Sequence, residues 1–236
     1  MTSDLFGDLP KGYGLRWYQQ EAKEAIDAAL LDVRSALYVA ATGTGKTETF
    51  AALAGDWKGK VLVLAHRDEL VEQARVRLER LTGEWVEIEK ADRKCGPETR
   101  LVVGSVQTLC SDARLSRFTR DHFQYIVVDE AHHAPAKSYR KILSYFSDAK
   151  VLGVTATPDR ADSLALGQIF DSVAYTFDIE DGIEQGYLVP FSPETQRVFL
   201  EEIDLSGIDL QSGDLAQGQL DTAMMNHAIE ETAPLG

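Results

Sequence analysis

One segment of this 236-residue sequence constrains its fold more than any other. An apolar run at residues 36–41 leads directly into residues 42–47, which read TGTGKT, and a helical pattern follows at residues 48–55. A strand, a glycine-rich turn and a helix in succession gather backbone N–H groups at the positive end of a helix dipole. The sequence therefore predicts a phosphate-binding loop at the carboxyl end of a buried strand.

Each residue type in this loop suits that chemistry. Gly43 and Gly45 allow the backbone to turn its amides toward phosphates, Lys46 would neutralise the β and γ phosphates, and the Thr47 hydroxyl would bind Mg²⁺. Ala40 departs from the general pattern, which begins with glycine. The strand and helix on either side favour a nucleotide loop over an incidental glycine-rich turn.

A second apolar run, at residues 125–128, ends in Asp129 and Glu130. A carboxylate at the end of a buried strand needs a cation or hydrogen bonds to replace its lost hydration. We expect Asp129 to hold Mg²⁺ and Glu130 to polarise the attacking water. A helix cap is the alternative for both carboxylates. A transition-metal site with His132 and His133 is disfavoured, because the H-E-x-x-H spacing is absent.

The remaining apolar runs alternate with helical patterns, which is typical of an α/β fold with a doubly wound, mostly parallel sheet flanked by helices. The runs are continuously apolar, as expected for strands buried on both faces. The further expected strands are residues 60–65, 100–104, 124–129, 150–155 and, more weakly, 173–177. The expected helical stripes lie within residues 18–30, 70–81 and 139–146.

Composition limits the remaining possibilities. Residues 191–236 hold nine acidic residues and one basic residue, a net of −8 out of the chain's −14, which predicts a domain at residues 1–190 and an acidic linker at residues 191–236. Two cysteines cannot form a disulfide framework. The longest apolar run is far too short to cross a bilayer, and the N-terminus lacks the features of a secretory signal, so we expect a cytoplasmic protein without membrane contact.

The order of these motifs resembles that of superfamily-two helicases, the DEAD/DEAH-box ATPases with a RecA-like P-loop NTPase domain. The segments that carry the resemblance are residues 15–19, 42–47, 65–70, 104–109, 129–132 and 155–158. Residues 65–70, 155–162 and 184–190 are most similar to the branch of restriction-enzyme motor subunits and RadD-like repair helicases.

The resemblance implies roles for individual residues. The nucleotide would be held by Arg16, Gln19, Thr42, Gly43, Thr44, Gly45, Lys46 and Thr47. The residues that would couple the nucleotide to nucleic acid are His132, Thr155 and Thr157. The backbone of a single strand would be contacted by Arg67, Gln107, Thr108 and Arg160. Simpler alternatives remain for three of them: Gln19 as an exposed polar helix start, His132 as a buried histidine bonded to a hydroxyl, and Arg67 as a solvated charge.

The implied function is that of the ATP-binding half of a helicase or translocase that uses ATP and Mg²⁺ and acts on nucleic acid, with DNA favoured over RNA. The motifs of a second RecA-like domain, including its arginine finger, are not found, so we expect a fragment of a longer protein with weak hydrolysis. A non-catalytic, nucleotide-dependent binding module is the alternative. A small-molecule phosphotransferase is disfavoured, since residues 129–132 and 155–158 would share no role.

Overall fold

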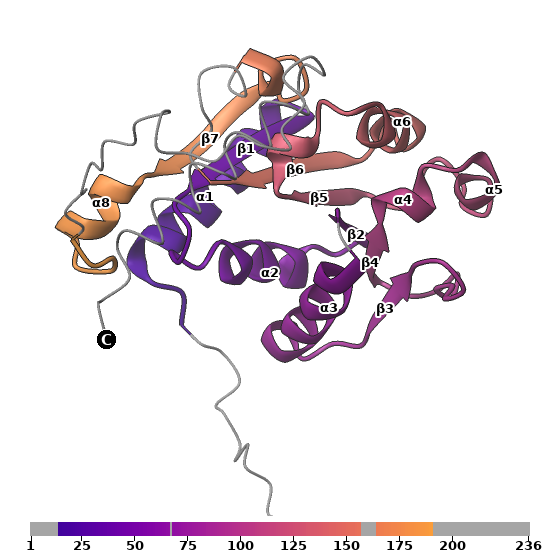
Figure 1. Ribbon diagram of the computed structural model, residues 1–236, viewed down its shortest axis with the longest axis horizontal. Helices are drawn as coiled ribbons and strands as arrows, with labels where there is room; N and C mark the ends of the chain where they lie inside the picture. Colours follow the sequence, from indigo (N-terminus) through magenta and orange to yellow (C-terminus); the bar gives the residue numbers. More distant parts are fainter. Residues whose placement is uncertain (1–13, 67, 157–163, 191–236) are drawn as a thin grey trace, which may run out of the picture. The chain divides into compact units, whose positions relative to one another are not determined.

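The computed structural model describes residues 14–66, 68–156 and 164–190 (Figure 1). Three residues with predicted roles, Arg67, Thr157 and Arg160, lie outside this range, as does the predicted linker at residues 191–236. The helices are α1 Trp17–Asp32, α2 Lys46–Asp56, α3 Asp68–Thr82, α4 Val106–Leu109, α5 Asp112–Leu115, α6 Lys137–Tyr145 and α8 Ile179–Glu184, with a 3₁₀ turn η1 at Ala131–His133. The strands are β1 Ser35–Ala40, β2 Val61–Ala65, β3 Val86–Glu89, β4 Leu101–Ser105, β5 Tyr125–Asp129, β6 Lys150–Thr155 and β7 Ser172–Phe177.

In the described part of the chain these strands form one seven-stranded sheet in the order β3-β4-β2-β5-β6-β1-β7. Every pairing between neighbouring strands is parallel. The carboxyl ends of all the strands therefore lie along one edge of the sheet, where ligands bind in open α/β folds. The expectation of a doubly wound parallel sheet is confirmed.

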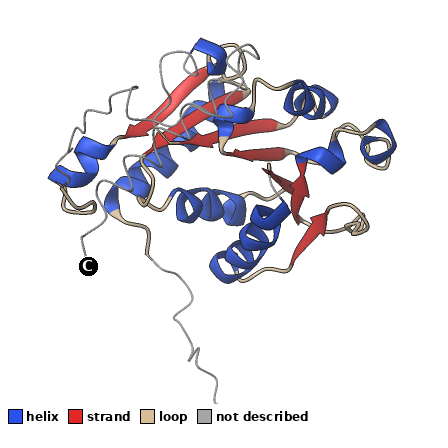
Figure 2. Cartoon of the chain, in the orientation of Figure 1, coloured by secondary structure: helices blue, strands red, loops and turns tan. Residues whose placement is uncertain are grey.

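Helices cover both faces of the sheet (Figure 2). Helices α1, α2 and α3 pack on one face, and α4, α5 and α6 pack on the other. Strand β2 shows how the sequence allows this, because Val61 and Val63 belong to the first core whereas Leu62 and Leu64 belong to the second. A strand that is apolar on both sides can be buried only between two helical layers.

The expected strands agree with the observed ones to within one residue at each end. Strand β3 is not among them, because in Val86-Glu87-Ile88-Glu89 apolar and acidic residues alternate over only four positions. It lies at the edge of the sheet, where only one neighbour is needed. No helix in the described ranges combines the length and hydropathy that a bilayer crossing requires.

Candidate active site

The glycine-rich loop joins β1 to α2, as the sequence predicts. Gly43 has φ 88° and Gly45 has φ 83°, a left-handed conformation that side-chain-bearing residues rarely adopt. A Cβ on Gly45 would lie 2.3 Å from Nε2 of Gln19. Glycine at this position is therefore required both by the backbone and by the neighbouring amide.

Helix α1 supports the loop through hydrogen bonds. The Tyr18 hydroxyl donates to the Thr44 carbonyl at 2.6 Å. Nε2 of Gln19 donates to the carbonyls of Thr44 and Gly45 at 3.1 and 3.2 Å. The Thr44 hydroxyl donates to the Ala41 carbonyl at 2.6 Å. The carbonyls of Ala41, Thr44 and Gly45 are thus satisfied from within the protein, which supports a loop conformation able to present backbone amides to an anion.

Gln19 is 4% exposed, so the alternative of an exposed polar helix start is wrong. Its Oε1 accepts the backbone N–H of Arg16 at 2.8 Å, while its Nε2 holds the loop. Both ends of the amide are therefore engaged within the protein. Recognition of adenine by Gln19 stays a prediction.

Lys46 begins α2 and extends back across the loop, where its Nζ donates to the carbonyls of Ala40 and Ala41 at 3.0 and 3.4 Å. Burial lowers the pKa of Lys46, and the charges of Glu130 and Asp129 oppose that shift. The ammonium group therefore lies within electrostatic reach of both carboxylates. Only β6 separates β1 from β5, which explains how segments far apart in the sequence meet here.

Asp129 is the last residue of β5, and burial partly desolvates its carboxyl group. Burial raises the pKa of its carboxyl group, and the adjacent charge of Glu130 raises it further, while Lys46 opposes the rise. Such a carboxylate gains from a cation, and its oxygens together with the Thr47 hydroxyl are donors that Mg²⁺ prefers. These residues fit a magnesium ion.

Glu130 adopts a left-handed conformation, with φ 51°, which is uncommon for a residue with a side chain. Its side chain makes no cap bond to η1, so the alternative of a helix cap is not supported for it. The carboxylate is 42% exposed and one of its oxygens lies 3.4 Å from Nδ1 of His132. Strain of this kind concentrates at functional sites, where it fixes the direction of a side chain.

One cleft of about 860 Å³ brings the two motifs together. Its lining includes the predicted residues Arg16, Gln19, Thr42, Gly43, Gly45, Lys46, Thr47, Asp129 and Glu130. Arg77 and Arg80 of α3 also line it, and Arg77 forms an ion pair with Glu48. Sequence reasoning missed these two arginines, because they lie on the polar side of an amphipathic helix whose apolar stripe alone is informative.

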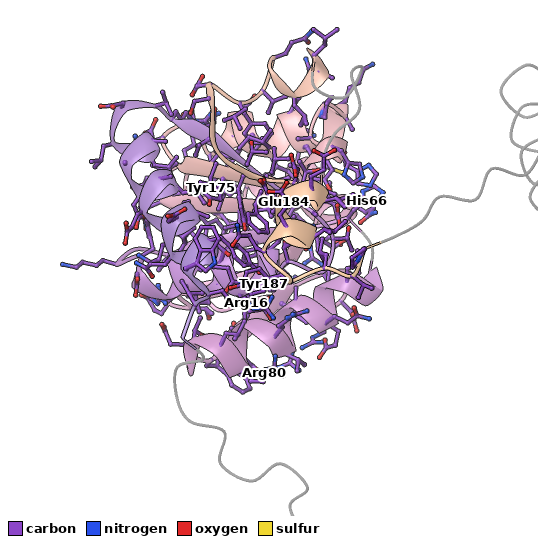
Figure 3. All side chains as sticks on the ribbon, turned by 90° about the vertical axis from the view of Figure 1, so that its left-hand side faces the viewer. Arg16, His66, Arg80, Tyr175, Glu184 and Tyr187 are labelled. Carbon is purple, nitrogen blue, oxygen red and sulfur yellow. The ribbon has the colours of Figure 1, made fainter. Side chains whose placement is uncertain are left out.

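Tyr187 contacts Arg16, which lines the cleft, and sequence reasoning missed this contact. The Arg16 guanidinium lies 4.8 Å from the centre of the Tyr187 ring, and Figure 3 shows the two residues side by side. Arg16 also donates to the Tyr18 hydroxyl at 3.1 Å. Tyr18 in turn stacks on Phe177 at the end of β7, with ring centres 4.1 Å apart. The residues at the start of α1 are therefore held by contacts with Phe177 and Tyr187, which lie near residue 190, the last described residue.

A chain of rings runs from the acidic pair toward the middle of the sheet edge. Nδ1 of His132 lies 3.4 Å from the Thr155 hydroxyl, which places these two predicted coupling residues together. The His132 ring lies 4.1 Å from that of His133, which stacks on His66 at 4.3 Å. Gln107 donates to the His66 carbonyl. His66 and His133 thus extend the connection to the segments that follow β2 and β4.

Gln107 and Thr108 are the two predicted nucleic-acid residues that the structure describes. Gln107 also accepts a bond from Ser105 at 2.9 Å, and the Thr108 hydroxyl accepts the backbone N–H of Ala91 at 2.9 Å. Both side chains therefore lie at the carboxyl edge of the sheet, several strands away from the glycine-rich loop.

Comparison with known proteins gives a family and a fold. The model of the family described as "Type III restriction enzyme, res subunit" matches residues 12–160. The EcoAI endonuclease subunit, from a type I restriction enzyme of Escherichia coli, is 31% identical over 220 residues, which cover 88% of this chain and 26% of that protein. The chain spans about a quarter of the length of the curated relatives it matches.

Two solved structures share the fold. The UvsW helicase of bacteriophage T4 matches with a TM-score of 0.56 and 19% identity, over 67% of this chain and 59% of that one. The ATP-dependent type ISP restriction-modification enzyme LlaBIII, bound to DNA, matches with a TM-score of 0.59 and 21% identity, over 75% of this chain and 16% of that one. With its glycine-rich loop and acidic strand end in one cleft, the chain belongs to the type III restriction enzyme res subunit family, as a RecA-like domain of the restriction-subunit-like branch of superfamily-two helicases.

Proposed function

We propose that this chain is the ATP-binding half of a helicase or translocase that acts on nucleic acid, and on DNA rather than RNA. One observation carries the proposal: Lys46, Asp129 and Glu130 line the same cleft, although Lys46 begins α2 and the two carboxylates lie at the end of β5. Membership of a restriction-enzyme family supports DNA as the substrate. The structural neighbour LlaBIII is described as ATP-dependent and bound to DNA, which agrees with both parts of the proposal.

Different residues of the cleft would bind the phosphates and the metal ion of a bound triphosphate. Amides of the glycine-rich loop and the Lys46 ammonium group hold the β and γ phosphates and spread their charge. The Thr47 hydroxyl and the Asp129 carboxylate would hold Mg²⁺, which supplies charge neutralisation at the phosphate oxygens when bound. The raised pKa of Asp129 supports this assignment, since a cation would compensate for its lost hydration.

Glu130 holds the attacking water and accepts its proton. Its carboxylate is exposed enough for water to reach it, and its left-handed backbone fixes its direction. His132, 3.4 Å from Glu130 and from the Thr155 hydroxyl, positions that carboxylate relative to the strand end at β6. A change in the position of Thr155 would therefore alter the position of the Glu130 carboxylate through the imidazole ring of His132.

Hydrolysis by this chain alone is expected to be slow. An arginine finger is worth roughly 10³–10⁵ in rate, and in the resemblance it belongs to a second RecA-like domain. We therefore expect binding of Mg-ATP with little turnover, and no strand separation by these 236 residues on their own. Robust unwinding by the purified chain would contradict this.

Calorimetric titration with Mg-ATP tests the site. Lys46→Ala should lower the affinity by roughly tenfold or more, because nothing replaces its charge-assisted hydrogen bond to phosphate. Lys58→Ala is the matched control, since Lys58 is an exposed lysine in the turn before β2, at the opposite edge of the sheet. Equal affinities in the two variants would defeat the assignment.

A second titration tests the substrate class. The chain should bind single-stranded DNA at low salt, more tightly than RNA of the same sequence, and binding should weaken steeply as salt rises. Binding of Mg-ATP without any binding of nucleic acid would favour the alternative, a nucleotide-dependent binding module.

A further inference from the structure

The cleft that holds the glycine-rich loop and the acidic strand end extends beyond both of them. Its lining also includes Glu48 and Ala52 of α2 and Arg77, Arg80 and Leu81 of α3. Ala52 lies about 9 Å along the axis of α2 from Lys46, and Figure 3 shows Arg80 below Arg16 on the same side of the molecule. The proposed phosphate and metal sites use none of the residues from Glu48 onward, which leaves this part of the cleft for the rest of the nucleotide.

Glu48 and Arg77 form an ion pair that joins α2 to α3 beside this part of the cleft. A guanidinium nitrogen of Arg77 donates to Oε1 of Glu48. The Glu48 side chain is 23% exposed and the Arg77 side chain is 46% exposed, so the pair remains open to the cleft. The cleft wall therefore carries a charged hydrogen-bond acceptor directly beside several N–H donors.

The second carboxylate oxygen of Glu48 lacks a partner. Oε2 is buried and makes no hydrogen bond to any residue in the described ranges. It lies beside the glycine-rich loop, 3.1 Å from the position that a Cβ on Gly45 would occupy. A buried acceptor without a partner is costly, and the last torsion of a glutamate has broad preferences, so a rotation of the carboxylate would turn this oxygen toward a donor in the cleft.

Charge indicates which part of a nucleotide meets this pair. A carboxylate repels phosphates, and the loop amides and Lys46 are placed to hold them. The base has its predicted contacts with Arg16 and Gln19, which line the cleft at the start of α1. The sugar lies between base and phosphates, and each of its hydroxyl groups both donates and accepts a hydrogen bond. A carboxylate beside a guanidinium group is complementary to such hydroxyls, and dinucleotide-binding folds also use an acidic residue for the ribose.

We propose that the Glu48–Arg77 pair binds the ribose hydroxyl groups of the nucleotide and makes the chain selective for nucleotides that carry them. The inference rests on the proposed function, because it assigns a further part of the same ligand. A ribose hydroxyl donates to the Glu48 carboxylate, and Arg77 neutralises the carboxylate so that it can lie close to the phosphates. A nucleotide without the hydroxyls leaves a buried acceptor unpaired, which is the arrangement that best rejects a substrate lacking one polar group.

The test is a calorimetric comparison of Mg-ATP with the magnesium complex of 2′,3′-dideoxy-ATP, which has the same base and triphosphate but neither hydroxyl. It is made for the unaltered chain, Glu48→Ala and Glu98→Ala. Glu98 is the matched control, since it is an exposed glutamate in the turn before β4, at the amino ends of the strands. Inorganic tripolyphosphate with Mg²⁺ reports on the phosphate site alone.

We expect the unaltered chain and the control to bind ATP roughly tenfold more tightly than the dideoxy analogue, as for the loss of one hydrogen bond to a charged group. In Glu48→Ala the two nucleotides should bind with nearly equal affinity. The readout is the ratio of the two affinities, because removal of a negative charge also changes the attraction for phosphates. Glu48→Gln keeps the shape of the side chain and should retain a preference of only a few-fold, since its acceptor is uncharged.

The outcomes separate the inference from the proposed function. If the unaltered chain binds both nucleotides equally well, the inference is wrong and the proposed function stands. If Glu48→Ala or Glu48→Gln keeps the full preference for ATP, other residues recognise the hydroxyl groups and the inference is wrong as well. If neither ATP nor tripolyphosphate binds the unaltered chain, the proposed phosphate site fails, and the inference with it.

Discussion

Asp129 ends β5 and Glu89 ends β3, two strands of the same parallel sheet. Both carboxylates lose hydration through burial, but their pKa values shift in opposite directions. The pKa of Asp129 is raised, because burial and the charge of Glu130 outweigh the hydrogen bond from the Glu130 backbone N–H and the charge of Lys46. The pKa of Glu89 is lowered, because two arginines and a backbone amide outweigh its burial. Glu89 has its partners within the protein, whereas the partner that we propose for Asp129 is a magnesium ion.

Buried charge therefore serves two functions along one edge of the sheet. In the cleft, the pKa of Lys46 is lowered and that of Asp129 is raised, so both charged forms gain when a magnesium-triphosphate group binds. Around Glu89 the charges of Arg114 and Arg117 neutralise the carboxylate, and both arginines donate hydrogen bonds to backbone carbonyls of residues 91–95, which follow β3. The pKa shifts against ionisation at Lys46 and Asp129 lie in the cleft, whereas the pKa shift toward ionisation at Glu89 lies in a cluster of charges that neutralise one another.

The largest expected effect is on stability, at Glu89. Glu89→Ala leaves Arg114 and Arg117 without their buried partner, which should lower the free energy of unfolding by about 3–5 kcal/mol. Urea denaturation followed by circular dichroism measures it. A decrease below about 1 kcal/mol would mean that the cluster is solvated and that the two carboxylates do not differ as described.

Asp129→Asn should have the opposite effect on stability and a large effect on binding. The amide is uncharged, so the variant no longer buries a desolvated charge and should melt at a higher temperature than the unaltered chain. Its affinity for Mg-ATP should fall by roughly tenfold or more, as for a missing metal ligand. Calorimetry and a thermal melt on the same sample check both parts, and a variant that melts lower would break the comparison.

The pH dependence of that stability difference follows from the sign of the shift. Because the pKa of Asp129 is higher in the folded chain than in the unfolded chain, ionisation costs stability as pH rises from the ordinary value of 3.8 through the raised value. The advantage of Asp129→Asn should therefore be complete above the raised pKa and should shrink as pH falls toward 3.8. Unfolding free energies of both chains across this range provide the check, and a pH-independent difference would count against the assigned shift.

The smallest expected effect concerns Tyr187. Tyr187→Leu removes the ring that faces Arg16, and a cation–π interaction of about 0.5–1 kcal/mol corresponds to a roughly two- to fivefold weaker nucleotide affinity. Tyr187→Phe keeps the ring and is the control, which should bind as the unaltered chain does. Equal binding by all three chains would show that the contact between the Tyr187 ring and Arg16 contributes nothing to nucleotide binding.

Sequence reasoning succeeds where function depends on short contiguous motifs that the topology of the sheet then brings together. The glycine-rich loop, the acidic strand end and the parallel order of the strands are all predictable, and parallel strands bring their carboxyl ends to one edge. The convergence of Lys46 and Asp129 in one cleft follows from this topology. The pairing of His132 with Thr155 follows from the resemblance, and the structure places the two 3.4 Å apart.

The features that sequence reasoning misses depend on distant segments meeting in space. The role of Glu89 is visible only when Arg114 and Arg117 are folded over it, and Tyr187 becomes relevant only when it meets Arg16. The His66–His133 stack likewise joins the end of β2 to η1. Hydropathy patterns carry no signal for such pairs, since each residue alone resembles an ordinary polar or aromatic surface position.

The most direct test of the central claim is the effect of Mg²⁺ on ATP affinity, measured by calorimetry for the unaltered chain, Lys46→Ala and Asp129→Asn. We predict that Mg²⁺ strengthens ATP binding to the unaltered chain, that Asp129→Asn loses this enhancement, and that Lys46→Ala binds weakly with or without the metal. Full enhancement by Mg²⁺ in Asp129→Asn would contradict the claim that the glycine-rich loop and the acidic strand end hold one metal-bound triphosphate.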